Sequence, residues 1–153
     1  MECWLVRHGE STWNSERRFQ GTLDAPLSAR GRAQASALAA GLADTRFDAL
    51  YTSPLSRARD TAAACAERLG LEAVPLDELR EICLGDWEGL TLEAVLAREG
   101  EYYRRWLERP LNAIWSFRLA NASITRVVLP AGRLLAVNET AHLRDVGPVM
   151  VAP

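Results

Sequence analysis

The chain has 153 residues, of which 48% are hydrophobic and 25% charged, and its formal net charge at pH 7 is −2. This length and composition predict one folded globular domain and exclude an intrinsically disordered or low-complexity chain. No apolar stretch is long enough to span a membrane, and the near-neutral charge gives no general attraction to nucleic acid or anionic lipid.

The cysteines, the histidines and the first residues add expectations about location and cofactors. Cys3, Cys65 and Cys83 have no close pairing, which predicts buried, reduced thiols rather than a disulfide framework. The first residues lack the basic region and long apolar core of a signal peptide, so we expect a cytoplasmic protein. With only His8 and His142 and no Cys-x-x-Cys, we expect no transition-metal site. Every basic residue is arginine, so a bound anion must be held by guanidinium groups, backbone amides or histidine.

The first half of the chain alternates apolar runs with helical patterns. The run Cys3–Val6 predicts a buried strand that ends in a loop. Ser28 is a suitable N-cap for a helix predicted over residues 29–43, where alanine and leucine recur at helical spacing. A second strand is predicted over Phe47–Thr52. A helix follows over residues 53–69, with a capping serine and a proline at its start.

The second half adds one helix and three more strands. A third strand is predicted over Glu72–Leu76 and a helix over Leu92–Trp106, with Pro110 as its terminator. Ile124–Leu129 and Leu134–Val137 predict two strands joined by a hairpin. The order β-α-β-α-β-α-β-β predicts an α/β fold, a three-layer α/β/α sandwich whose central sheet is mostly parallel with an antiparallel edge.

Three segments combine residue types that suit phosphate chemistry. Arg7, His8 and Gly9 follow the first strand, at the end of the sheet where ligands bind in open α/β folds. Arg57 lies in the first turn of a helix, where the helix amides also favour anions. The acidic loop around Glu81 offers a general acid if the fold buries that carboxyl group. Each segment alone also fits a structural role: a packed turn, a solvated arginine and a surface loop.

Further motifs surround these three segments in a fixed order. They are Leu5–Asn14, Gln20–Ser28, Gly31, Gln34–Ala35, Ser53–Ala58, Thr61–Ala62 and Glu81–Gly89, with Asn138–Leu143 as a closing strand. As an ordered set they resemble the histidine phosphatase superfamily, which contains cofactor-dependent phosphoglycerate mutases and many phosphatases. The main motifs extend over roughly the first two-thirds of the chain, and as an ordered set they are highly specific.

The resemblance implies a phosphoglycerate mutase-like fold and phosphoryl transfer in two steps. His8 would be the nucleophile that becomes a phosphohistidine, and Arg7 and Arg57 would bind the phosphoryl oxygens. Glu81 would protonate the leaving oxygen and then activate water. A covalent intermediate divides one difficult displacement into two easier ones, and this chemistry needs no metal or other cofactor. The residues implied to lie beside the phosphoryl group and the substrate are Asn14, Gln20, Gly21 and Thr22.

One part of the family pattern is missing. The family has a second active-site histidine in a Ser-His-Gly or similar turn after another central strand, and this sequence has no such turn. Tyr102–Arg109 resembles the helix before that part, and Leu111–Trp115 resembles the linker after it. We therefore expect residues 1–153 to form a single domain from which a helix–strand–helix segment is missing near Pro110, roughly 50 residues by ordinary element lengths. His142 lacks a following glycine and is expected to be structural.

Two explanations of the missing segment stay open. The working protein contains a segment that this chain lacks, which we favour because the flanks on both sides read as native. Alternatively the chain is truncated, keeps a phosphate pocket and loses transition-state stabilisation. Loss of a central strand leaves unpaired backbone and exposed apolar surface, which folds rarely tolerate.

Three functions remain as hypotheses. The leading one is a phosphomonoester hydrolase for a small phosphorylated metabolite, because Gly85–Thr91 followed directly by a helix resembles the compact phosphatases, including those of the alpha-ribazole type. The second is a cofactor-dependent phosphoglycerate mutase, whose family members typically carry a longer insertion at this point. The third is a non-catalytic phospho-ligand binding protein. We expect a small phosphorylated substrate as the partner, no nucleic acid and no membrane, and leave a homodimer open.

Overall fold

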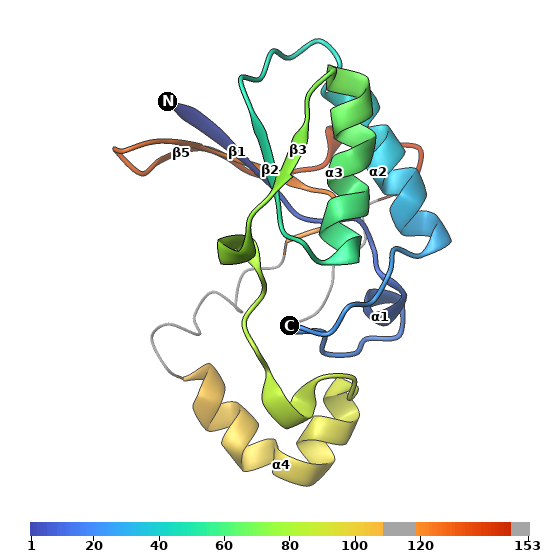
Figure 1. Cartoon of the computed structure of the whole chain (residues 1–153). Coiled ribbons are helices and arrows are strands. Elements are labelled where there is room, and N and C mark those ends of the chain that lie inside the picture. The colour runs from blue at the N-terminus through green and yellow to red at the C-terminus, as the bar shows by residue number, and fades with distance from the viewer. Residues whose placement is uncertain (109–118, 148–153) are drawn as a thin grey trace.

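Helices and strands alternate along the chain in the predicted order, which confirms the α/β class (Figure 1). The computed structural model describes residues 1–108 and 119–147, so Pro110 and the linker over residues 111–115 lie outside the described residues. Within the described part, no helix is both long and apolar enough to cross a membrane. The elements are β1 (Glu2–Val6), α1 (Thr12–Ser15), α2 (Ala29–Gly41), β2 (Leu50–Thr52), α3 (Ser56–Leu69), β3 (Ala73–Pro75), α4 (Leu92–Leu107), β4 (Ile124–Val128) and β5 (Arg133–Glu139), with short 3-10 helices over Asp77–Leu79, Gly85–Trp87 and Ala141–Leu143.

The helix starts depend on local capping. The predicted cap of α2 is confirmed, because the Ser28 hydroxyl accepts from the Gly31 N–H at 3.0 Å. The predicted start of α3 is wrong by two residues: Leu55 and not Ser53 is the N-cap, and the helix begins at Ser56. The Ser53 hydroxyl accepts only from the Leu55 N–H, at 3.4 Å, which closes a turn before the helix instead of capping it.

The described strands form two separate sheets. β4 lies between β1 and β5 and pairs antiparallel with both, whereas β2 pairs parallel with β3. The hairpin predicted near the end of the chain is therefore confirmed. In the described part of the chain, no ladder of backbone hydrogen bonds joins β1 to β2. Most of the strand pairing there is antiparallel, unlike the mostly parallel sheet expected from the sequence.

One face of the strands is covered by α2 and α3, which lie side by side in Figure 1. Leu38 of α2, Leu42 at its C-cap and Cys65 of α3 form a buried cluster with Ile124, and Trp4 of β1 packs against it. Side chains alternate across a strand, so the next residues of β1 and β2 point the other way.

The opposite face of these strands is open to solvent in the described part of the chain. Leu5 of β1 is 55% exposed and Tyr51 of β2 is 56% exposed. Burying such side chains normally stabilises a fold by about 1.5–3 kcal/mol each. The third layer expected from the sequence, which would cover these residues, is not seen among residues 1–108 and 119–147.

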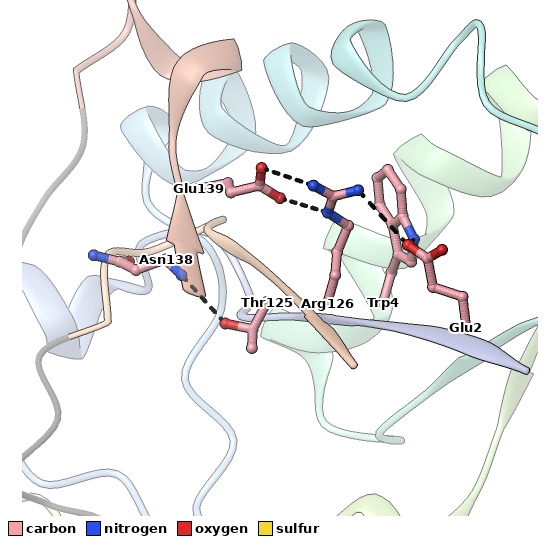
Figure 2. A network of polar contacts seen from close by, with 6 residues as sticks. All are labelled: Glu2, Trp4, Thr125, Arg126, Asn138 and Glu139. Atoms are coloured by element: carbon pink, nitrogen blue, oxygen red, sulfur yellow. Dashed lines mark hydrogen bonds and ion pairs between the residues drawn. The ribbon is translucent and has the colours of Figure 1, made fainter. Parts of the chain in front are cut away.

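The three-stranded sheet is tied together by a polar network across its strands (Figure 2). The Arg126 guanidinium of β4 lies 2.9 Å from Glu139 of β5 and 3.7 Å from Glu2 of β1, and it stacks 5.2 Å above the Trp4 ring. These groups are partly exposed, so the network contributes modestly to stability. β5 ends at Glu139 and a 3-10 turn follows over Ala141–Leu143, so the predicted closing strand is wrong beyond its first two residues.

A second hydrophobic cluster surrounds α4 at the other end of the molecule from α2 and α3 (Figure 1). Trp87 is 6% exposed and packs against Tyr103, Trp106 and Phe19. Its indole N–H donates to the carboxylate of Glu99, where α4 bends. This cluster anchors the loop that begins at Phe19 to the chain that precedes α4.

The three cysteines are free, but only one fits the prediction that they are buried. Cys65 is buried in the main cluster, and this burial raises its pKa to about 11. Cys3 is partly buried, and Cys83 is exposed in the loop before α4. The burial expected of Cys83 is therefore wrong, because its neighbours form a surface loop.

Candidate active site

His8 lies in the loop that follows β1, and its ring is held by its own backbone neighbour. Nδ1 is 2.6 Å from the Gly9 carbonyl oxygen, which can only accept, so Nδ1 carries the proton and Nε2 keeps its lone pair. The pKa of His8 is lowered to about 3, mainly by burial and also by the charges of Arg7 and Arg57, while the bond to Gly9 acts in the opposite direction. The imidazole is therefore neutral at physiological pH, the state in which an imidazole can act as a nucleophile.

The backbone of the His8 loop packs directly against the start of α2. A Cβ on Gly9 would overlap the Gly31 carbonyl, and a Cβ on Gly31 would overlap the Glu10 carbonyl. The Gly9 N–H donates to the Thr61 hydroxyl at 3.0 Å, and that hydroxyl donates to the Arg57 carbonyl at 2.7 Å. Two glycines and one threonine thus position the loop between α2 and α3.

Arg57 in the first turn of α3 is a buried cation, so the alternative of a solvated surface arginine is wrong. Its side chain is 3% exposed and donates to the carbonyls of Leu23 at 3.0 Å and Gly21 at 2.9 Å. Burial lowers its pKa, while the nearby negative charge of Glu81 acts in the opposite direction. A guanidinium in this place is held ready to bind an anion through its fork of donors.

Arg7 adds a second cation to the same place. Its guanidinium donates to the Leu119 carbonyl at 2.6 Å. Burial lowers its pKa; the charge of Glu81 raises it, and the charge of Arg57 lowers it. Because Arg7 and Arg57 also both lower the pKa of His8, these three residues lie within electrostatic reach of one another. The arrangement favours an anion beside a neutral imidazole.

Glu81 lies near these cations but is not buried. It is exposed in the irregular loop between β3 and α4, and its Oε1 accepts from the Ile82 N–H at 3.0 Å. Its charge raises the pKa values of both arginines, which places it on the same side of the molecule. The condition of a buried carboxyl group is therefore not met, and the alternative of a surface loop describes this segment.

Asn14 and Gln20 belong to one hydrogen-bonded chain. The Ser11 hydroxyl accepts from the Asn14 N–H and donates to Gln20 Oε1 at 2.7 Å, while the Ser11 N–H donates to Asn14 Oδ1. This capping box forms α1, a helix that the sequence analysis did not predict. It orients both predicted substrate-binding side chains beside the His8 loop.

Gly21 and Thr22 form a turn that is closed by Glu88. The Gly21 φ of +52° favours glycine, and a Cβ there would overlap the Glu88 carboxylate. That carboxylate accepts from the Thr22 N–H at 2.9 Å and from the Leu84 N–H at 2.9 Å. Burial pushes the pKa of Glu88 upward, but these hydrogen bonds outweigh burial and lower it. Glu88 thus remains ionised and holds the turn whose carbonyl groups bind Arg57.

Sequence reasoning missed Asn121 as a residue of this site. Asn121 is fully buried, and its amide donates to the His8 carbonyl and to Asn14 Oδ1, each at 3.2 Å. The Asn-Ala-Ser stretch before β4 has no distinctive spacing that could have indicated this contact. His142 bonds to the Ala122 carbonyl at 2.8 Å, which agrees with its predicted structural role.

The neutral state of His8 predicts a pH dependence of stability. Its pKa falls from 6.5 to about 3 on folding, so between these values the unfolded chain binds a proton that the folded chain does not. Protonation of the unfolded chain therefore lowers the free energy of unfolding at low pH. The stability that depends on the neutral His8 ring is fully present above pH 6.5 and is lost as the pH falls toward 3. We expect wild type to lose up to about 2 kcal/mol more stability than His8→Asn between pH 7.5 and pH 5 in urea titrations. Equal losses in both proteins would contradict the shift.

Comparison with known proteins places this geometry in context. Residues 3–112 match the model of the histidine phosphatase superfamily (branch 1). Phosphoserine phosphatase 1 of Hydrogenobacter thermophilus is 45% identical over 106 residues, which are 69% of this chain and 50% of that protein. A probable phosphoglycerate mutase of Escherichia coli O1:K1 is 37% identical over 107 residues, 70% of this chain and 49% of that protein. The chain thus spans about half the length of these curated relatives.

The fold also resembles solved structures. A mycobacterial glucosyl-3-phosphoglycerate phosphatase in complex with VO3 superposes with a TM-score of 0.81 at 27% sequence identity. The match covers 91% of this chain and 99% of that one. The similarity therefore includes residues beyond the 3–112 family match.

Proposed function

Because the chain belongs to the histidine phosphatase superfamily (branch 1), we propose that it is a phosphomonoester hydrolase that acts through a phosphohistidine on a small phosphorylated metabolite. The observation that supports this most directly is a neutral, partly buried imidazole within electrostatic reach of two guanidinium groups, of which Arg57 is buried and Arg7 partly buried. A phosphoryl group needs charge neutralisation and positioning more than covalent help, and this arrangement supplies both.

The proposed reaction has two displacements at phosphorus. In the first, Nε2 of His8 attacks, a P–N bond forms, and the P–O bond to the leaving group breaks as that oxygen takes a proton from Glu81. In the second, Glu81 takes a proton from water, whose oxygen attacks phosphorus, and the P–N bond breaks to release phosphate. Arg7 and Arg57 neutralise the phosphoryl oxygens in both steps. Asn14 and the turn Gln20–Thr22 lie beside the substrate.

A phosphoglycerate mutase is the second candidate. A curated relative that is 37% identical is named a probable phosphoglycerate mutase, and this name is the reason to test for mutase activity. In this chain only the four residues 88–91 separate the 3-10 helix Gly85–Trp87 from α4, too few for an insertion that closes over a bisphosphate. This short connection favours hydrolysis.

We also propose that full activity needs a helix–strand–helix segment near residue 110, and that residues 1–153 form one domain around it. The support is that β1 and β2 belong to separate sheets in the described part of the chain, while Leu5 and Tyr51 stay exposed. Its strand would pair between the two sheets. If the working protein lacks this segment, a non-catalytic phospho-ligand binding protein becomes the better hypothesis. An intact-mass measurement on protein from its natural source decides: the mass of the 153-residue chain would overturn the added segment.

Two assays on the protein purified from its natural source distinguish the functions. Hydrolysis of p-nitrophenyl phosphate is compared with bisphosphoglycerate-stimulated mutase activity, and we expect hydrolysis to dominate. Mutase turnover well above hydrolysis would overturn the choice. Brief incubation with a labelled phosphomonoester should leave acid-labile phosphate on the protein. Binding of inorganic phosphate with neither turnover nor labelling would favour the non-catalytic protein.

The remaining expectations belong to the same proposal. We expect a cytoplasmic enzyme without a metal or other cofactor, and a homodimer stays open as its assembly. Excess chelator should leave the rate of hydrolysis unchanged, because the two guanidinium groups neutralise the phosphoryl charge. A loss of activity that Mg²⁺ or Zn²⁺ restores would contradict this expectation.

A further inference from the structure

The turn over residues 119–123 is distant in sequence from the His8 loop but is hydrogen-bonded to it. The Arg7 N–H donates to the Ser123 carbonyl at 3.1 Å, and the Ala122 N–H donates to the His8 carbonyl at 3.0 Å. The Arg7 side chain donates to the Leu119 carbonyl. All three bonds join positions more than a hundred residues apart in sequence, and the turn lies outside the family match over residues 3–112.

Within this turn, the Asn121 side chain bonds to the backbone of His8 and to the side chain of Asn14. Both N–H donors of the Asn121 amide are used, one on the His8 carbonyl and one on Asn14 Oδ1, at 3.2 Å each. Asn121 therefore joins the backbone of the nucleophile to a predicted substrate-binding residue. No other described side chain bonds to both.

The other end of the Asn121 amide is left without a hydrogen bond. Its Oδ1 is buried and has no partner among the described residues. A buried carbonyl without a donor is unfavourable for stability, and native proteins rarely keep one without a functional reason. An apolar residue would fit a purely structural turn better. The amide is thus better explained by its two donated bonds than by stability.

The turn around Asn121 is itself braced. Ala122 has a φ of +56°, which a residue with a Cβ seldom adopts. The Ala122 carbonyl lies 2.8 Å from His142 Nε2, and the Ala120 N–H donates to Asn138 Oδ1 at 2.8 Å. Figure 2 shows Asn138 at the end of β5, where its N–H donates to Thr125. These contacts hold an unfavourable backbone conformation that keeps the Asn121 amide against His8.

We propose that Asn121 is a positioning residue that holds the His8 carbonyl and the Asn14 amide in one fixed relation, so that the imidazole and the bound phosphoryl group stay aligned. This inference rests on the proposed function. A carboxylate at position 121 cannot donate either bond, and an alanine leaves both acceptors without this donor. Small displacements of a reacting group can slow a reaction by about a hundredfold.

The test uses Asn121→Ala and Asn121→Asp in the full chain, with Arg126→Gln as a matched control in the adjoining strand. We expect both Asn121 variants to lower kcat for p-nitrophenyl phosphate by about tenfold to a hundredfold, with KM changed less than about threefold. Arg126→Gln breaks the network of Figure 2, and we expect it to lower the unfolding midpoint without lowering kcat. Asn121 variants that lose stability and keep kcat would overturn the proposal.

A second readout does not depend on turnover. Titration of the His8 imidazole by NMR should show its pKa rising from about 3 toward 6.5 in Asn121→Ala, because the released loop exposes the ring to water, and unchanged in Arg126→Gln. Asn121→Asp is left out of this readout, because its carboxylate would raise the pKa by charge alone. If wild type shows no hydrolysis and no phosphohistidine, the proposed function fails. The positioning role of Asn121 is then tested by this titration alone. An unchanged His8 titration in Asn121→Ala would then overturn the positioning role.

Discussion

Replacing His8 by alanine should abolish phosphomonoester hydrolysis. Because the variant lacks the nitrogen that forms the covalent intermediate, we expect kcat to fall by on the order of 10⁴- to 10⁶-fold, a loss typical of removing a nucleophile. Hydrolysis of p-nitrophenyl phosphate measures the loss. A second measurement is acid-labile phosphate on the protein after a brief incubation with labelled substrate, which wild type should carry and His8→Ala should lack.

The control for this experiment is the state of the fold. His8→Ala keeps the backbone that accepts from Ala122 and Asn121, so its unfolding midpoint at pH 7.5 should stay close to that of wild type. A folded variant that still hydrolyses substrate or still carries acid-labile phosphate would show that the nucleophile is another residue.

Removing the Arg57 guanidinium is expected to have the next largest effect. In Arg57→Ala, the phosphoryl oxygens lose a buried cation, and the carbonyls of Gly21 and Leu23 lose their donor. We expect kcat/KM to fall by about 10²- to 10³-fold, the usual result of deleting one stabilising donor from an active site. Steady-state kinetics and the affinity for inorganic phosphate by calorimetry measure this effect.

Arg57→Lys separates charge from geometry at the same position. Lysine keeps the positive charge but lacks the planar fork that bonds to two carbonyls and to an anion at once. We therefore expect this variant to recover only a small part of the lost kcat/KM. Full recovery would mean that charge alone matters, and an unchanged Arg57→Ala enzyme would exclude Arg57 from the site.

Local features of the fold were predictable from the sequence, whereas contacts between distant segments were not. Capping by Ser28 and the hairpin between β4 and β5 depend on neighbouring residues, and the structure confirms both. The pairing of β1 with β4 joins Val6 to Ile124, and no local pattern indicates such a partner. Composition also cannot distinguish a buried arginine from a solvated one, because its carbonyl partners come from a loop 34 to 36 residues away.

In the candidate site, too, local motifs were predictable and contacts between distant segments were not. The motifs around His8 and Arg57 were predictable, because each lies where a strand meets a loop or a helix begins. The exposure of Glu81 and the contact of Asn121 with His8 depend on how the loop before α4 and the turn before β4 pack, which sequence spacing does not encode. For this reason the sequence left open whether Glu81 is buried and missed the buried amide of Asn121.

The division of the strands into two sheets has a consequence for motion. His8 follows β1 of one sheet and Arg57 begins the helix after β2 of the other, and in the described chain no ladder of backbone bonds spans the two. Their separation is instead set by the packing of α2 against α3 and by the Gly9–Thr61 hydrogen bond. Such helix packing permits small sliding movements, as in shear-type closure. Small changes in this packing would therefore change the distance between His8 and Arg57 in the described chain.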